Sequence, residues 1–343
     1  MKEERQLIAD TLTRLLRDKC EPSTVDAAEA GEWPGELWQA LTDTGLTLAG
    51  ISANAGGAGG EPGDSLLVLR QAAKFAAPVP LAEHYMSALL MQEAGATLAS
   101  DRATLAEGNF KLTDGKLEGE ASGVAFARWC RHILLVANAA DGRKLCLAPR
   151  ESLTIAEKNN LAGEPRDDIK AAGAEAIQIV DAPQQVAEFI HRLGAATRTA
   201  MMSGALESVL ELSVQYVQER KQFGRPLAKF QAIQQQLAVL AGEVAAASMA
   251  AHALEGAFPA LDEVEIALGK ARVGEAVAQA TDIAHQVHGA MGYTLEHPLN
   301  HRSRRLWAWR DEYGAEFAWQ QTLGRVMLAG GADELWHRVT ARN

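Results

Sequence analysis

Along the first hundred positions the apolar residues recur every three or four places, which is the pattern of amphipathic helices. One stripe runs through Leu7, Ile8, Leu12, Leu15 and Leu16. Pro34 stands where a second helix would begin, a position at which its missing N–H costs nothing. After a glycine-rich stretch at 52–63, we expect Asp64 or Ser65 to cap a further helix. The pattern predicts an N-terminal helical domain over 1–100.

Between 101 and 185 the period changes to two, and turn residues separate short apolar runs. Asp114-Gly115 and Asp141-Gly142 are hairpin signals, because such pairs tolerate the positive φ of a tight turn. The strands that we expect are Phe110–Thr113, Lys116–Gly119, Ile133–Ala137, Lys144–Ala148 and Ala176–Val180. This region is predicted to be a small, trimmed, β-barrel-like domain that is partly open.

From 186 to 343 the helical period returns. Three long, Ala-rich segments at 187–219, 230–255 and 261–288, with a shorter one at 316–328, are typical of a four-helix bundle. The whole pattern predicts a mainly α protein with a small central β domain.

The composition narrows the classes of partner. The 343 residues are 48% hydrophobic and 22% charged, as in an ordinary globular protein rather than a disordered one. Thirty-three Lys and Arg against 44 Asp and Glu give a formal charge of −11, which argues against a nucleic-acid surface or an anionic-membrane binder. Any anionic ligand must therefore meet a local basic patch.

Apolar runs fall short of the roughly 20 residues that cross a bilayer, and the charged start does not resemble a signal peptide. Three scattered cysteines, Cys20, Cys130 and Cys146, form no metal-ligand motif and fit buried thiols in a reducing compartment. We expect a cytoplasmic protein without a membrane span.

Three cations, Arg220, Lys221 and Arg225, stand at the end of the first long C-terminal segment, with Phe223-Gly224 among them. The helix dipole favours cations at a helix C-terminus without any function, so a purely structural helix end is one interpretation. A sharp turn that presents arginine and backbone N–H groups is also a clamp for a pyrophosphate. The spacing alone leaves both open.

His285 and His288 lie three residues apart at the end of the last long segment, with Asp282 one turn earlier. This spacing could ligate a metal, but the chain offers no partner motif, and we expect no metal. The glycines that follow, Gly289 and Gly292, more simply end the helix and let a ligand approach the backbone closely.

A second basic cluster precedes a pair of carboxylates. It contains Arg302, Arg304, Trp307, Arg305, Trp309, Arg310, Asp311 and Glu312. A solvated charge run is one reading, and nucleic-acid binding is another, although the surrounding region is not basic overall. A carboxylate beside an apolar aromatic cluster is also a candidate general base, because desolvation raises a carboxyl pKa.

Two C-terminal motifs strongly resemble those of the acyl-CoA dehydrogenases. Residues 216–234 read YVQERKQFGRPLAKFQAIQ, and residues 286–298 read QVHGAMGYTLEHP. The order of a helical region, a small β region and a helical bundle resembles that family over nearly the whole chain. The resemblance implies a flavoprotein oxidoreductase of lipid metabolism that forms the α,β double bond of an acyl-CoA thioester.

The resemblance also implies FAD as cofactor and assigns its contacts. Arg220, Gln222 and Phe223 match the positions that reach the FAD pyrophosphate of the adjacent subunit, and Gln286, Gly289 and Ala290 match those at the adenosine end. Because the family shares each FAD across an interface, the resemblance implies a homodimer or tetramer, or a heteromer with a homologous subunit. An electron-transfer flavoprotein is the implied electron acceptor.

In the family, the catalytic base is usually a Glu directly before a glycine in a late loop. Aligned on Gly314, that position holds Tyr313, and Glu312 one residue earlier is our candidate for the catalytic base. Some members carry the base near the start of the first long C-terminal helix, where this chain has about Gly194 or Ala195 and no carboxylate.

The middle region departs further from the family pattern. It has no Thr-Glu-Pro-x-x-Gly-Ser segment, and 122–128 replaces the aromatic-Ile-Thr-Asn segment. Short members of this kind sometimes serve as one half of a heteromeric enzyme. Two alternatives to an FAD-dependent dehydrogenase therefore stay open: a non-catalytic or half-site subunit of such a heteromer, and a flavin-free helical interaction protein.

Overall fold

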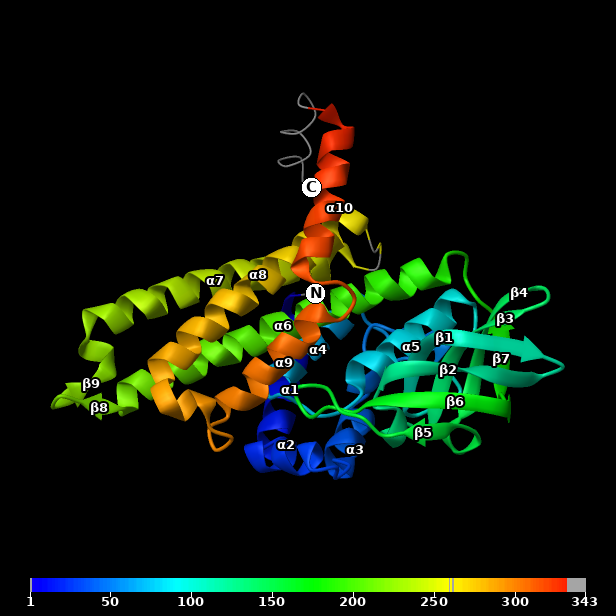
Figure 1. Ribbon diagram of the computed structural model, residues 1–343, viewed down its shortest axis with the longest axis horizontal. Coiled ribbons are helices and arrows are strands. Elements are labelled where there is room, and N and C mark those ends of the chain that lie inside the picture. Colours follow the sequence, from blue (N-terminus) through cyan, green and yellow to red (C-terminus); the bar gives the residue numbers. More distant parts are fainter. Residues whose placement is uncertain (1, 259, 261, 332–343) are drawn as a thin grey trace. The chain divides into compact units, whose positions relative to one another are not determined.

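The computed structural model describes residues 2–258, 260 and 262–331, and it divides into two compact units, Met1–Leu193 and Gly194–Asn343 (Figure 1). The α-helices are α1 (Lys2–Lys19), α2 (Pro22–Glu29), α3 (Gly35–Asp43), α4 (Gly63–Lys74), α5 (Leu81–Glu93), α6 (Val186–Glu219), α7 (Gln231–Ala257), α8 (Glu263–His288), α9 (Leu299–Asp311) and α10 (Glu316–Ala329). The strands are β1 (Ala103–Thr113), β2 (Lys116–Ala125), β3 (His132–Ala139), β4 (Gly142–Pro149), β5 (Thr154–Ala156), β6 (Arg166–Glu175), β7 (Gln178–Asp181), β8 (Lys221–Gln222) and β9 (Arg225–Pro226). The mainly α architecture with a central sheet confirms the predicted fold class.

In the first unit, the predicted apolar stripe of α1 is only partly buried, since Leu7 is 67% exposed. Leu12 and Leu16 of the first stripe are fully buried, and Pro34 is the N-cap residue of α3. The expected cap at Asp64 or Ser65 is wrong, because α4 already begins at Gly63. The Asp64 carboxylate instead accepts hydrogen bonds from the Glu61 backbone N–H at 2.8 Å and the Arg5 Nε at 2.9 Å, which ties α1 to α4.

The central sheet has seven strands in the order β5-β6-β2-β1-β3-β4-β7 and is mixed, because β1 and β3 run parallel. Both predicted hairpins are confirmed: Asp114 and Gly115 have positive φ between β1 and β2, and Ala139 pairs with Gly142 between β3 and β4. Helix α5 packs against β1 (Figure 1). The sequence prediction missed β6, whose charged and small residues lack a clear apolar alternation.

The segment after β2 is fixed from within the first unit. Phe126 has φ 54 and is buried, and Arg128 turns its guanidinium onto Asp167, which is fully buried. The Arg128 Nε and backbone N–H each donate to the Asp167 carboxylate at 2.8 Å. The segment that replaces the family's aromatic-Ile-Thr-Asn pattern therefore ends in an arginine that an internal carboxylate holds.

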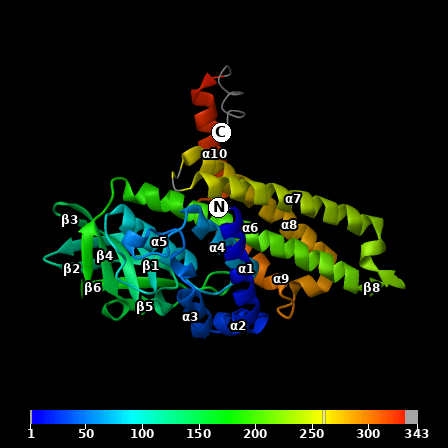
Figure 2. The ribbon, with the colours of Figure 1, turned by 180° about the vertical axis from the view of Figure 1, so that it is seen from behind.

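The second unit is built from α7, α8, α9, α10 and the greater part of α6. Helices α7 and α8 run side by side in both views (Figure 2). Ser248 of α7 donates to Glu207 of α6 at 2.7 Å, and Trp307 of α9 donates to Thr281 of α8 at 3.3 Å. These contacts support the predicted bundle, while α10 packs along α8.

Helix α9 was not predicted as a helix of its own, since charge obscures its apolar face. Arg305 is 1% exposed, and the Arg302 Nε donates to Ser208 of α6 at 3.2 Å. The interpretation of this stretch as a solvated charge run is therefore wrong for Arg302 and Arg305. The three cysteines are buried thiols, as expected, and none of them is in a disulfide.

Helix α7 is unusually apolar. It is the one helix among residues 2–258, 260 and 262–331 that is long and apolar enough to span a membrane by length and composition, with a mean hydropathy of 1.6 over its most apolar window. Only 28% of that window is buried, and Met249 and Val239 are exposed. The apolar side chains of α7 are thus only partly covered within one chain.

Candidate active site

The turn between α6 and α7 presents the first group of candidate cofactor residues. Strands β8 and β9 pair Gln222 with Arg225, and the two residues between them have the positive φ of a tight hairpin turn: Phe223 at 52° and Gly224 at 78°. Phe223 is 91% exposed, and Arg220 is exposed as well. Arg225 lies over the Phe230 ring at 4.2 Å, which braces the turn. The turn therefore presents exposed cations on a tight hairpin.

The second group lies at the end of α8. Gln286, Gly289 and Ala290 are exposed, and Gly289 adopts φ 58 and ψ −139, a conformation for which glycine is suited. A Cβ at Gly289 would meet no atom within 4 Å, so the backbone there is open to a ligand. The helix thus ends as the glycine pattern predicts.

A stack of rings joins these two groups at one end of the bundle. Tyr216, one turn before Arg220 on α6, stacks on His288 at 4.4 Å, and His297 lies 4.7 Å from His288. Burial lowers the pKa of His288 to about 4, although its bond to the Ala284 carbonyl opposes that shift. The imidazole is therefore neutral at pH 7 and acts here as a packing ring.

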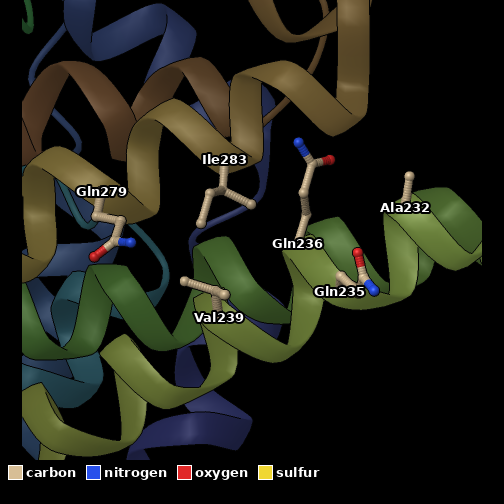
Figure 3. Close-up of a pocket in the computed structure, with 6 residues that line it drawn as sticks. All are labelled: Ala232, Gln235, Gln236, Val239, Gln279 and Ile283. Atoms are coloured by element: carbon tan, nitrogen blue, oxygen red, sulfur yellow. The ribbon is translucent and has the colours of Figure 1, made fainter.

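A shallow hollow of about 460 Å³ lies between α7 and α8 (Figure 3). Its lining residues are Ala232, Gln235, Gln236, Val239, Gln279 and Ile283. Glutamine amides from both helices border the hollow, and Figure 3 shows Val239 and Ile283 between them. The lining of this hollow contains no titratable side chain.

Glu312 follows directly after α9, and its carboxylate meets a buried cation. Its Oε2 accepts from the Arg198 Nε at 2.6 Å; the Arg198 side chain is 1% exposed and that of Glu312 is 22% exposed. Arg198 also donates to the Met201 sulfur at 3.4 Å and lies 5.5 Å from the Tyr313 ring centre. The carboxylate of the candidate base is therefore held in one orientation by a charge-assisted hydrogen bond.

Tyr313 occupies the space beside Gly194. A Cβ at Gly194 would lie 2.3 Å from the Tyr313 ring, so this site on α6 admits no side chain while the ring is there. The resemblance allows a base at two positions. The one before Gly314 holds Tyr313, and the one on α6 is covered by the Tyr313 ring. The nearest carboxylate is that of Glu312, the residue before Tyr313.

The loop that carries Glu312 is fastened at several points. The ammonium of Lys270, on α8, donates to the carbonyls of Arg310 and Gly314, each at 2.7 Å. The Trp319 indole N–H donates to the Tyr313 carbonyl at 3.0 Å. Arg310 pairs with Glu316 across the loop, and this hydrogen bond lowers the pKa of Glu316.

The two regions occupy distant parts of α6. Eighteen residues separate Arg198, beside Glu312, from Tyr216, beside the cationic turn, which is about 27 Å of helix. The structure thus groups the six candidate cofactor residues at one end and keeps the candidate base away from them.

Family models match both ends of the chain. The model of the acyl-CoA dehydrogenase N-terminal domain matches residues 2–101, and that of the acyl-CoA dehydrogenase C-terminal domain matches residues 191–310. The chain belongs to the acyl-CoA dehydrogenase family. The resemblance seen in the two sequence motifs is thereby confirmed, and the chain is a member of an oxidoreductase family.

Relatives of this acyl-CoA dehydrogenase share its length. Acyl-CoA dehydrogenase IpdE2 of Mycolicibacterium smegmatis is 28% identical over 302 residues, which cover 87% of this chain and 91% of the relative. Acyl-CoA dehydrogenase IpdE2 of Mycobacterium tuberculosis is 27% identical over 315 residues, with 87% and 89% covered. The chain is thus similar to these relatives over most of its length.

Solved structures share the fold. A variant of the Tcur3481-Tcur3483 steroid ACAD superposes with a TM-score of 0.84 at 22% identity, covering 96% of this chain and 99% of the other. The ChsE4-ChsE5 complex from Mycobacterium tuberculosis gives a TM-score of 0.80 at 21% identity, covering 95% and 97%. At these identities the likeness shows the fold alone.

Sequence reasoning missed Arg198 and Lys270, although each carries a usable signal. Both are cations inside Ala-rich helical stretches, and the residues directly beside each are small: Thr197 and Thr199, and Gly269 and Ala271. A charge on the buried face of a helix needs a partner, so each cation implied an acceptor elsewhere in the bundle. The sequence could not reveal that both acceptors lie in the loop after α9.

The contact between Gly194 and Tyr313 predicts a selective cost at one glycine. Gly194→Ala should displace the Tyr313 ring and lower the free energy of unfolding by about 1–3 kcal/mol, the usual cost of overpacking. Gly324→Ala is the control, since Gly324 is exposed within α10 and has no atom within 4 Å of an added Cβ. Urea unfolding of both variants measures the difference; equal stability of Gly194→Ala and the wild type would contradict the packing.

Proposed function

We propose that this acyl-CoA dehydrogenase is FAD-dependent, and that Glu312 removes the α-proton of an acyl-CoA thioester. The observation that carries the proposal is the fastened loop after α9, which holds a carboxylate in one orientation beside the position that the family uses for its base. Such fixation is what a general base requires, because proton transfer depends on placement before it depends on pKa.

The residues present fit FAD at its phosphate end. Arg220 is an exposed guanidinium on the α6–α7 turn, and such a group binds phosphate oxygens in a bidentate manner. The open backbone at Gly289 admits close approach, and Gln286 supplies an amide beside it. Together with Gln222, Phe223 and Ala290, these residues would hold the pyrophosphate and the adenosine end of the cofactor.

The reaction breaks two C–H bonds of the acyl chain and forms one C=C bond. FAD, when bound, supplies a two-electron acceptor for the hydrogen that leaves the β-carbon as hydride. Glu312 takes the α-proton, which the thioester carbonyl makes acidic, and Arg198 keeps the carboxylate oriented while it does so. Tyr313 covers the adjoining part of α6.

We also propose an oligomer whose subunits share each FAD. The exposed apolar side chains of α7 and the distance along α6 between Glu312 and the Arg220 turn both support this arrangement. The partner would be a second copy or a homologous acyl-CoA dehydrogenase subunit, and an electron-transfer flavoprotein would accept the electrons. Three buried cysteines that form no disulfide support the cytoplasm as the site of action.

A half-site subunit is the second candidate function. The Arg198–Glu312 ion pair favours it, because Arg198 already occupies one oxygen of the carboxylate. In that case the Arg220 turn of this chain would contact the flavin of a homologous partner, and that partner would carry its own base. The names of the Tcur3481-Tcur3483 and ChsE4-ChsE5 proteins, each with two components, support a heteromer.

The base assignment predicts a loss of chemistry without a loss of cofactor. Glu312→Gln should slow flavin reduction by acyl-CoA about 100- to 10,000-fold, the usual contribution of a general base. The flavin content should not change, and Asp311→Asn, on the exposed neighbour, should reduce at the wild-type rate. Stopped-flow bleaching of the flavin band under anaerobic conditions is the measurement. Unchanged bleaching in Glu312→Gln would favour the half-site function.

The cofactor assignment predicts a loss of affinity at the turn. Arg220→Gln should weaken FAD binding about 10- to 100-fold, since it removes a hydrogen-bonding charge worth about 1.5–3 kcal/mol. Lys221→Gln on the same turn is the matched control and should stay near the wild-type affinity. Equilibrium titration of the flavin-stripped protein, alone and with a homologous partner, measures both. Wild-type protein that takes up no flavin under either condition would support the flavin-free alternative.

A further inference from the structure

We propose that Lys270 is a positioning residue, which sets the place of Glu312 by joining the end of α9 to the start of α10. The proposal rests on the proposed role of Glu312 for its catalytic consequence, whereas the joining of the two helices rests on geometry alone. Lys270 touches neither of the candidate cofactor segments.

The geometry is that of one cation between two carbonyls. Lys270 is fully buried on α8, and its Nζ lies 2.7 Å from the carbonyl oxygens of both Arg310 and Gly314. The two oxygens are therefore no further apart than twice that distance. Since α9 ends at Asp311 and α10 begins at Glu316, the ammonium closes the link between them into a tight loop.

The loop needs such a closure because its own backbone is not helical. Tyr313 has φ 55 and Gly314 has φ 90, and the Arg310 carbonyl is one of the last on α9, where no helical N–H follows to satisfy it. A cation at this end of a helix also meets the negative pole of its dipole. The Lys270 ammonium, on the neighbouring helix α8, donates to the Arg310 carbonyl and places a positive charge at the negative pole of α9.

Charged groups on several elements face Lys270. Burial and, to a smaller extent, the charge of Arg198 on α6 lower the pKa of Lys270 to about 8, against the opposing charges of Glu312, Glu316 and Asp311. Lys270 is thus charged at pH 7 and largely neutral at pH 9. The neutral amine would hold the two carbonyls with weaker bonds, because charge-assisted hydrogen bonds are about twice as strong as neutral ones.

The direction of the linkage separates loop placement from unfolding. The folded pKa of about 8 lies below the ordinary value of 10.5, so between these values the unfolded chain binds more protons than the folded one. The contribution of Lys270 to stability therefore rises with pH across this window. A loss of activity from pH 7 to pH 9 through this group reports a released loop and not a melted protein.

The test combines amide exchange with a pH profile on the full-length protein loaded with FAD, with a partner subunit if one is needed. Lys270→Met should speed hydrogen exchange of the amides at 311–316 about tenfold, as local opening does, with α7 unaffected.

Wild-type kcat should fall about tenfold between pH 7 and pH 9, with the charged fraction of Lys270, and KM should change little. Lys270→Arg, which stays charged, should keep slow exchange and move the alkaline limb above pH 10. Lys170→Met, on an exposed β6 position, is the control.

Unchanged exchange at 311–316 in Lys270→Met would overturn the proposal. If Lys270→Met does not fold, the wild-type protein still decides, because its exchange at 311–316, corrected for the intrinsic pH effect, must rise from pH 7 to pH 9. The exchange result does not depend on the base assignment. If Glu312 is not the base, the predicted exchange at 311–316 still holds. If Lys270 does not hold the loop, the predicted effect of Glu312→Gln on flavin reduction still holds.

Discussion

The candidate site depends on two buried cations that have their acceptors at the end of α9 and in the loop that follows it. Arg198 on α6 binds the Glu312 carboxylate, and Lys270 on α8 binds the carbonyls on either side of it. Burying a charge is costly unless it is paired, so each cation stabilises the bundle only while the loop keeps its shape. The contacts that stabilise the buried cations of the bundle are thus the same contacts that place the candidate base.

The same constraint explains the departures from the family pattern. Tyr313 stands one residue after the carboxylate, and its ring needs the bare backbone of Gly194. The chain has accordingly no carboxylate at the α6 position, and Glu312 reaches a cation that lies one helical turn further along α6. The Arg220 turn and the end of α8 form a separate group at the other end of the bundle, which fits a flavin shared between subunits.

Much of the fold could be predicted from the sequence, and the elements and contacts that were missed have physical reasons. The long C-terminal helices, both hairpins and the family were recognisable from period, turn residues and two motifs. Helix α9 was missed because Arg302 and Arg305 are charged residues on its buried face, and the Arg302–Ser208 hydrogen bond shows that an acceptor there can come from another helix. Strand β6 was missed because its inward positions include Asp167, whose burial depends on Arg128 from a distant segment. The Lys270 and Arg198 contacts join residues 40 to 114 positions apart, which no local pattern reveals.

The account rests on a carboxylate that takes a proton from the α-carbon of an acyl-CoA. The most direct measurement is incorporation of solvent deuterium at that carbon, followed by NMR or mass spectrometry with the FAD-loaded protein in D₂O. The account predicts incorporation with the wild-type protein and its loss in Glu312→Gln. Incorporation at an equal rate in both proteins, or in neither while acyl-CoA still reduces the flavin, would contradict the account.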